Sequence, residues 1–131
     1  MKFSIPIKTF FILLAYICLC VPCQAGETRL RLFFGLSLPG GGGVSLAQWQ
    51  TWEKEVLSKK LEGFNVVDST GYYKGRMERS KVVTVILFKN DAKMREKIND
   101  IVQDYLIKFR QDSVLAVESD VEAQFMTRTI K

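Results

Sequence analysis

The sequence predicts an α+β domain in which the elements follow the order β-α-β-β-α-β. Two segments carry apolar residues at helical spacing, and four segments alternate or run apolar as strands do. Stretches rich in glycine or polar residues separate these segments. All of them lie between Gly26 and Lys131, a length that suits one domain.

The first strand and the first helix have clear boundaries. A strand with one buried face is predicted over 29–36, where Leu30, Leu32 and Phe34 alternate with Arg31, Phe33 and Gly35. A loop with four consecutive glycines follows over 37–43. Ser45 and Gln48 have the spacing of a capping box, so we expect a helix from there to about Leu61. Gly63 is predicted to end it in a left-handed conformation. The apolar stripe of this helix consists of Leu46, Trp49, Trp52, Val56 and Leu57.

The middle of the chain predicts two strands joined by a turn. The first strand covers 64–73, and its polar second half is typical of a sheet edge. The turn covers 74–79 around Gly75. The next strand covers 80–88 and is almost entirely apolar, which indicates a central position in the sheet.

The last third predicts a long helix and a final strand. The helix begins at Asn90 or Asp91 and extends to about Arg110. The last strand covers 113–117, and a short further strand through Phe125 is an open alternative. The apolar stripe of the helix consists of Met94, Ile98, Ile101, Tyr105 and Phe109. Ion pairs are expected on its outer side, between Asp91 and Arg95 and between Asp104 and Lys108.

This order is that of the ferredoxin-like split βαβ fold, a four-stranded antiparallel sheet with two helices on one face. The other face would carry Arg31, Phe33 and Gly35 together with apolar residues of the central strand. An open face with an apolar centre usually meets a partner, often a second copy. We therefore expect a homodimer joined through the open face of the sheet.

The first 25 residues predict a cleaved signal peptide. Lys2 and Lys8 supply positive charge, the apolar run 9–21 follows, and the small residue Ala25 favours cleavage before Gly26. That run is shorter than the ~20 residues of a permanent membrane helix. We expect export to the periplasm or the medium and no transmembrane segment in the mature chain. An uncleaved anchor and a lipid-modified cysteine remain as alternatives.

The composition excludes several kinds of chemistry. The chain has no histidine, and its three cysteines, Cys18, Cys20 and Cys23, all precede the predicted cleavage site. The mature chain therefore lacks a cysteine nucleophile, a Ser-His-Asp triad and thiolate or imidazole metal ligands, and we predict neither metal nor cofactor. The net charge of +5 falls to about +3 without Lys2 and Lys8, which does not favour nucleic-acid binding.

Two weak candidate sites remain. Asp68, Tyr72, Glu78 and Lys81 could form a polar cluster for acid–base catalysis, whereas the structural alternative is a turn and a protected edge strand. Arg31 could bind an anionic ligand on the open face, or lie flat over apolar neighbours. The glycine-rich loop before Ser45 lacks the lysine of a phosphate-binding loop.

Several motifs of the chain resemble domain-of-unknown-function family 3574 of bacterial exported proteins. They are Phe34-Gly35-Leu36-Ser37-x-Pro39, Val44-Ser45, Trp49, Gly63-Phe64, Asp68 with Gly71-Tyr72, Glu78-x-Ser80-Lys81-Val82 and Phe109-x-Gln111-x-Ser113-Val114-Leu115-x-Val117. The four-glycine loop and Asn65 depart from the pattern. The resemblance implies one compact domain and no particular activity.

Two classes of function follow from these observations. The first is a periplasmic or secreted binding module without enzymatic activity. The second is a small enzyme of the dimeric α+β barrel type that uses carboxylate, lysine and tyrosine chemistry, an analogy of fold alone.

Overall fold

The computed structural model describes residues 26–88 and 91–129, so the predicted signal peptide and the alternative cap Asn90 lie outside the described residues. The strands are β1 (Glu27–Gly35), β2 (Asn65–Tyr73), β3 (Arg76–Leu87) and β4 (Leu115–Val121). The helical segments are α2 (Leu46–Trp52), the π-helical turn η1 (Glu53–Leu57), α3 (Ser58–Lys60) and α4 (Ala92–Lys108). The segments α2, η1 and α3 follow one another directly, so the element order is the predicted β-α-β-β-α-β.

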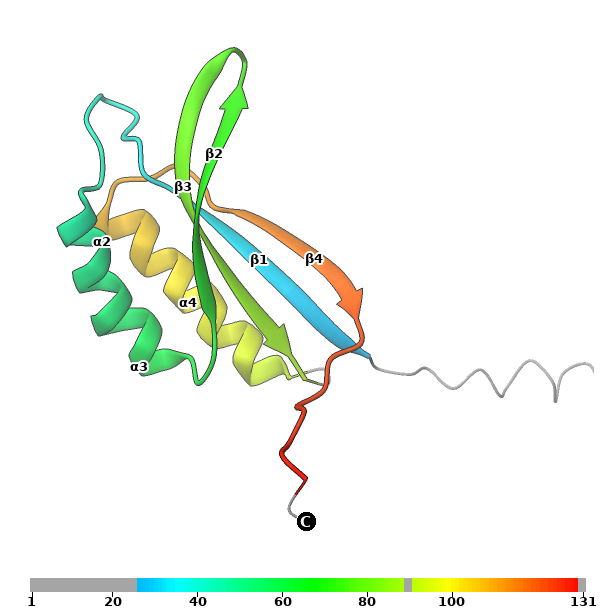
Figure 1. Ribbon diagram of the computed structural model, residues 1–131. Coiled ribbons are helices and arrows are strands. Elements are labelled where there is room, and N and C mark those ends of the chain that lie inside the picture. The colour runs from blue at the N-terminus through cyan, green and yellow to red at the C-terminus, as the bar shows by residue number, and fades with distance from the viewer. Residues whose placement is uncertain (1–25, 89–90, 130–131) are drawn as a thin grey trace, which may run out of the picture.

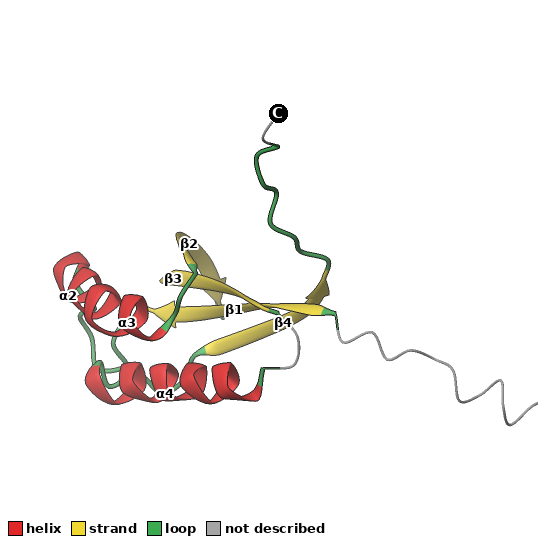
Figure 2. Ribbon diagram, turned by 90° about the horizontal axis from the view of Figure 1, so that it is seen from below, coloured by secondary structure: helices red, strands yellow, loops and turns green. Residues whose placement is uncertain are grey.

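The strands form an antiparallel sheet in the order β2-β3-β1-β4, with β3 inserted between β2 and β1. The helical segments cover one face of this sheet (Figures 1 and 2). The predicted α+β ferredoxin-like fold is therefore confirmed. The central position of β3 is confirmed as well, because it pairs with both β1 and β2.

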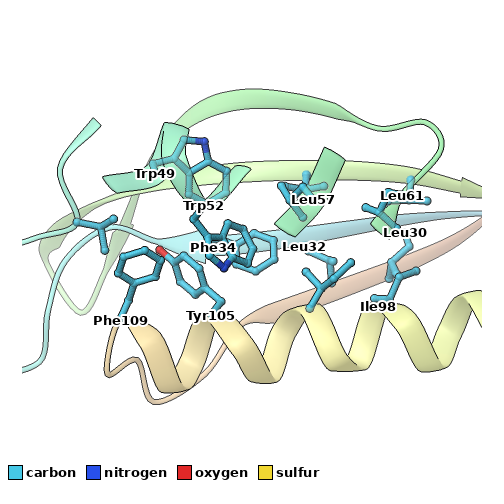
Figure 3. Packing of buried hydrophobic residues seen from close by; sticks show 14 of the residues in the cluster. Leu30, Leu32, Phe34, Trp49, Trp52, Leu57, Leu61, Ile98, Tyr105 and Phe109 are labelled. Atoms are coloured by element: carbon cyan, nitrogen blue, oxygen red, sulfur yellow. The ribbon is translucent and has the colours of Figure 1, made fainter. Parts of the chain in front are cut away.

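The alternation in β1 determines which side chains enter the core. Leu30, Leu32 and Phe34 are buried against the helices, as predicted, and their neighbours in β3 are Val83 and Val85. Figure 3 shows that the aromatic residues of the core gather at one end and the aliphatic residues at the other. The core is thus built from one face of the sheet only.

Phe34 lies at the centre of the aromatic end of the core. Its ring centroid is 5.3 Å from that of Trp52, 5.7 Å from Trp49 and 4.7 Å from Tyr105. The polar atoms of these rings all have partners. The Trp52 indole N–H donates to Asp104 at 2.6 Å, the Trp49 indole donates to Glu53, and the Tyr105 hydroxyl donates to the Gly35 carbonyl at 2.7 Å. Large aromatic residues can be fully buried here because their polar atoms are satisfied.

The hairpin between β2 and β3 is longer than predicted. Lys74 and Gly75 both have positive φ, 49° and 76°, as a two-residue type I′ loop requires. Such a tight loop lets pairing continue to Tyr73 opposite Arg76. The predicted turn over 74–79 is therefore wrong, and β3 begins at Arg76 instead of Ser80.

The end of the first helical region also differs from the prediction. The helix stops at Lys60, and Leu61 is extended because its side chain turns into the core, where it is 5% exposed. Gly63 is not among the residues with positive φ, so it does not provide the expected left-handed cap. The capping box of Ser45 and Gln48 is confirmed, whereas Leu46 is exposed instead of packing in the stripe.

The charged residues of α4 make contacts other than the predicted ion pairs. Asp91 caps the helix by accepting from the backbone N–H of Met94, and Arg95 binds Glu118 of β4 at 2.6 Å. Asp104 accepts from Trp52, so its carboxylate turns toward the core. The expected Asp91–Arg95 and Asp104–Lys108 pairs are therefore wrong, because Asp91 accepts from the first turn of the helix and the partners of Arg95 and Asp104 lie in other elements.

The C-terminal part of the chain also corrects the sequence analysis. Strand β4 continues to Val121 because it pairs with β1 as far as Glu27. Residues 122–129 belong to no strand, so the alternative of a short strand through Phe125 is wrong. This segment extends away from the sheet (Figures 1 and 2).

We predict that Ile98→Ala lowers the free energy of unfolding by ~2–5 kcal/mol, because Ile98 is 5% exposed within the core. Asp100→Ala, at an exposed position of the same helix, should cost under ~0.5 kcal/mol. Urea titration followed by tryptophan fluorescence measures both. Equal losses would mean that the orientation of α4 is wrong.

The contact between Trp52 and Asp104 generates a second prediction. Asp104→Ala should lower the free energy of unfolding by about 1–3 kcal/mol, because it leaves the indole N–H of a fully buried ring without an acceptor. Asp104→Asn keeps an oxygen acceptor and should lose less. The same urea titration tests this, and a loss from Asp104→Ala no larger than that from Asp100→Ala would contradict it.

Candidate functional site

The face of the sheet opposite the helices carries a continuous row of apolar side chains. Cross-strand pairing aligns Val67 with Val82, Val82 with Phe33, and Phe33 with Leu115. Residues paired in this way point to the same face of a sheet. Val67, Val82, Phe33 and Leu115 therefore form one row across all four strands, which we call the apolar row. Its ends are open to solvent, since Val67 is 53% and Leu115 61% exposed, whereas Val82 in the middle is 1% exposed and Phe33 is partly buried.

The next row along the strands consists of small residues. Ser69 pairs with Ser80, and Ser80 pairs with Gly35. We call these three residues the small-residue row. They line a hollow of about 710 Å³ together with Phe33 and Leu115 of the apolar row. The open face thus has a ridge and, beside it, a groove.

Arg31 lies on the other side of the apolar row, two residues before Phe33. Its guanidinium carbon is 5.1 Å from the centroid of the Phe33 ring, and the residue is partly buried. This contact agrees with the interpretation of an arginine that lies over apolar neighbours. Its role as an anion ligand stays a prediction.

Asp68 and Lys81, two of the proposed catalytic residues, form an ion pair. They face each other on β2 and β3, and the Lys81 ammonium is 2.6 Å from an Asp68 oxygen. The hydrogen bond from Lys81 lowers the pKa of the Asp68 carboxyl, which is therefore ionised at neutral pH. A carboxylate in this state cannot act as a general acid there.

The other two proposed catalytic residues do not converge on this pair. Tyr72 lies four residues beyond Asp68, about 13 Å along the strand, and is 75% exposed. Glu78 pairs with Gly71 and by alternation points to the opposite face from Lys81. Tyr72 and Glu78 both line the hollow, whereas Asp68 and Lys81 do not.

The glycine-rich loop uses its own backbone groups. The N–H groups of Gly41 and Leu38 donate to carbonyls of Leu38 and Gly42, and that of Val44 donates to Leu36. A Cβ at Gly43 would lie 2.8 Å from the Leu36 oxygen, so this position requires glycine. The loop is therefore closed on itself rather than arranged to hold an anion.

A second cleft of about 850 Å³ lies at the far end of the sheet. Its lining includes Leu61, Phe64, Ile86 and Met94, and the rings of Phe88 and Phe125 stack beside it at 5.5 Å. Within residues 26–88 and 91–129, no three acidic, histidine or cysteine side chains cluster as metal ligands would. No helix in the described ranges has the length and hydropathy to cross a membrane.

Sequence reasoning found only part of the open face. It named Arg31, Phe33 and Gly35, but it did not identify Val67 and Leu115 as their neighbours in one row. The sequence of β2 and β4 carried this signal weakly, because the neighbours of a residue on a sheet depend on the register between strands.

Comparison with solved structures shows the same fold in two structures of a phage SAM lyase. The enzyme in complex with S-methyl-5′-thioadenosine is 17% identical, with a TM-score of 0.51 over 73% of this chain and 82% of that chain. The apo enzyme is 16% identical, with a TM-score of 0.52 over 80% of this chain and 96% of that chain. At these identities the likeness concerns the fold alone.

The sequence comparisons agree with the resemblance seen in the motifs. A search of curated proteins finds no match. Residues 29–125, however, match the family described as "Protein of unknown function (DUF3574)". Since this match covers most of the chain, the protein belongs to the DUF3574 family.

Proposed function

We propose that this protein is an exported, non-enzymatic interaction module that works as a homodimer joined through the open face of its sheet. The observation that carries the proposal is the apolar row, whose ends, Val67 and Leu115, are exposed although Val82 between them is buried. A continuous apolar strip of this kind usually marks a protein interface. Its position on a sheet face without helices favours a second copy, since a two-fold interface needs one self-complementary surface.

The arrangement of polar groups supports a binding role over catalysis. Asp68 and Lys81 satisfy each other, and Tyr72 and Glu78 lie away from them. Burial raises the pKa of Tyr105, and its hydroxyl donates to the Gly35 carbonyl inside the core. Tyr105 lines neither of the two clefts described above. Catalytic groups normally converge on one reacting position, and these do not.

The enzyme alternative rests on the fold shared with the phage SAM lyase structures. Folds of this kind host many unrelated functions, so the likeness carries no activity to this chain. Acid–base chemistry would need Asp68, Lys81, Tyr72 and Glu78 in one place. Asp68 and Lys81 instead pair with each other, and the other two lie farther along the hairpin. The enzyme is therefore the second hypothesis. Turnover of a substrate by the purified protein would support it.

We predict that the purified protein is a dimer at micromolar concentration and that Leu115→Glu makes it monomeric. The substitution places a charge in the apolar row, where burial against a second copy would desolvate it. Light scattering coupled to size-exclusion chromatography measures the mass.

Ile107→Glu is the matched control for this prediction. Ile107 is 78% exposed on α4, on the helical side of the molecule, so its replacement should leave the dimer intact. A wild-type protein that stays monomeric at 100-fold higher concentration would refute the proposed function.

Export generates a separate prediction. The protein recovered from the periplasm or the medium should begin at Gly26, as measured by intact mass spectrometry. Ala25→Arg should block cleavage, because signal peptidase sites need a small residue at that position. Recovery of wild-type protein that still carries residues 1–25 would contradict cleavage of the leader.

A further inference from the structure

The relation between the two rows of the open face points to how a second copy is seated, an inference that rests on the proposed function. We propose that the apolar row of each copy lies over the small-residue row of the other. In this arrangement Arg31 of each copy pairs with Glu78 of the other. The open face is thereby specific for a second copy in one orientation.

The first step of the argument is the spacing of the rows. The apolar row and the small-residue row are neighbours on the same strands, about 6.6–6.8 Å apart. Consider a two-fold axis in the plane between the two sheets, parallel to the rows and midway between them. This axis exchanges the rows, so the ridge of one copy meets the groove of the other at two places. The hollow beside Phe33 and Leu115 is then filled by the apolar side chains of the second copy.

The second step concerns the rows that flank this pair. The row beyond the apolar row contains Thr84 and Arg31, and the row beyond the small-residue row contains Gly71 and Glu78. The same axis brings these flanking rows together. Arg31 is on β1 and Glu78 on the adjacent strand β3, so their backbones are offset by only one strand spacing, about 4.8 Å. Two long side chains of opposite charge can bridge such an offset.

Both side chains are available for this contact. Within the described ranges, neither Arg31 nor Glu78 forms an ion pair with another residue of its own chain. The Arg31 guanidinium rests on the Phe33 ring at the edge of the apolar row, and Glu78 is exposed. Opposite Glu78, Gly71 has no atom within 4 Å of the position of a Cβ, which leaves space for an incoming arginine.

An axis parallel to the strands gives a poorer fit. It would place apolar row on apolar row and small-residue row on small-residue row, which leaves a void between the two grooves. Voids in an interface forfeit contacts on both sides. With this axis at the centre of the sheet, Arg31 would lie over the polar residue Thr84, and Glu78 would have no opposite charge. Packing and charge therefore favour the same orientation.

Charge reversal tests the pairing of Arg31 with Glu78. Arg31→Glu and Glu78→Arg should each raise the dimer dissociation constant at least tenfold, since each places like charges together. The double variant R31E/E78R restores opposite charges and should return the constant to within about threefold of the wild type. Sedimentation equilibrium of the purified exported protein measures these constants, and thermal unfolding of each variant verifies its fold.

A groove-filling substitution tests the seating of the rows independently of charge. Ser80→Phe fills the small-residue row and should raise the dissociation constant at least tenfold, whereas Ser58→Phe on the exposed surface of α3 should not change it. The proposed orientation is wrong if the dissociation constant of the double charge variant rises by the product of the two single effects. It is also wrong if Ser80→Phe leaves the dissociation constant unchanged.

The outcomes separate this inference from the proposed function. Suppose that Leu115→Glu abolishes dimerisation, whereas the charge reversals and Ser80→Phe leave the dissociation constant unchanged. That result would support the open-face dimer and refute the proposed orientation. A monomeric wild type would overturn both. A monomer whose hollow binds a small molecule, seen as protection of Tyr72 and Tyr73 from nitration, would assign the hollow to a ligand instead.

Discussion

The register of β1 between β3 and β4 is the constraint on which both faces of this molecule depend. Phe34 reaches the centre of the aromatic core only because Leu30 and Leu32 precede it on the same side of the strand. The same alternation turns Arg31 and Phe33 to the opposite face. A slip of one residue would exchange the two sets and expose the core face to water. Core and open face are therefore two consequences of one pairing.

The aromatic core holds this register in place through directional contacts. The Tyr105 hydroxyl donates to the carbonyl of Gly35, at the end of β1, and so ties α4 to the strand. Asp104, one residue earlier in α4, accepts from Trp52 and ties the same helix to the first helical region. Apolar packing alone tolerates small shifts between elements, whereas hydrogen bonds with defined partners do not.

How much of this could be predicted from the sequence depends on the range of each interaction. Helices and central strands follow from local periodicity, so the fold, the stripe of α4 and the face of β1 were predictable. Contacts between distant segments were not. Asp104 was expected to pair with Lys108 four residues away, yet its partner, Trp52, lies in another helix. The hairpin loop was misplaced because its type I′ geometry uses Lys74 in a conformation that favours glycine or asparagine. The candidate site was the least predictable part, since Val67 and Leu115 join the row of Val82 and Phe33 only through strand pairing.

Most of the carboxylates with side-chain partners stabilise the fold, whereas Glu78 lies on the open face. Asp91 caps α4, Glu118 binds Arg95, Glu53 and Asp104 accept from the indoles, and Asp68 holds Lys81. The side chains of these acidic groups are thus engaged in contacts within the fold. Glu78 differs from them because it points to the open face, at the margin of the hollow. An acidic side chain in that position cannot stabilise the core, but it can select what approaches the apolar row.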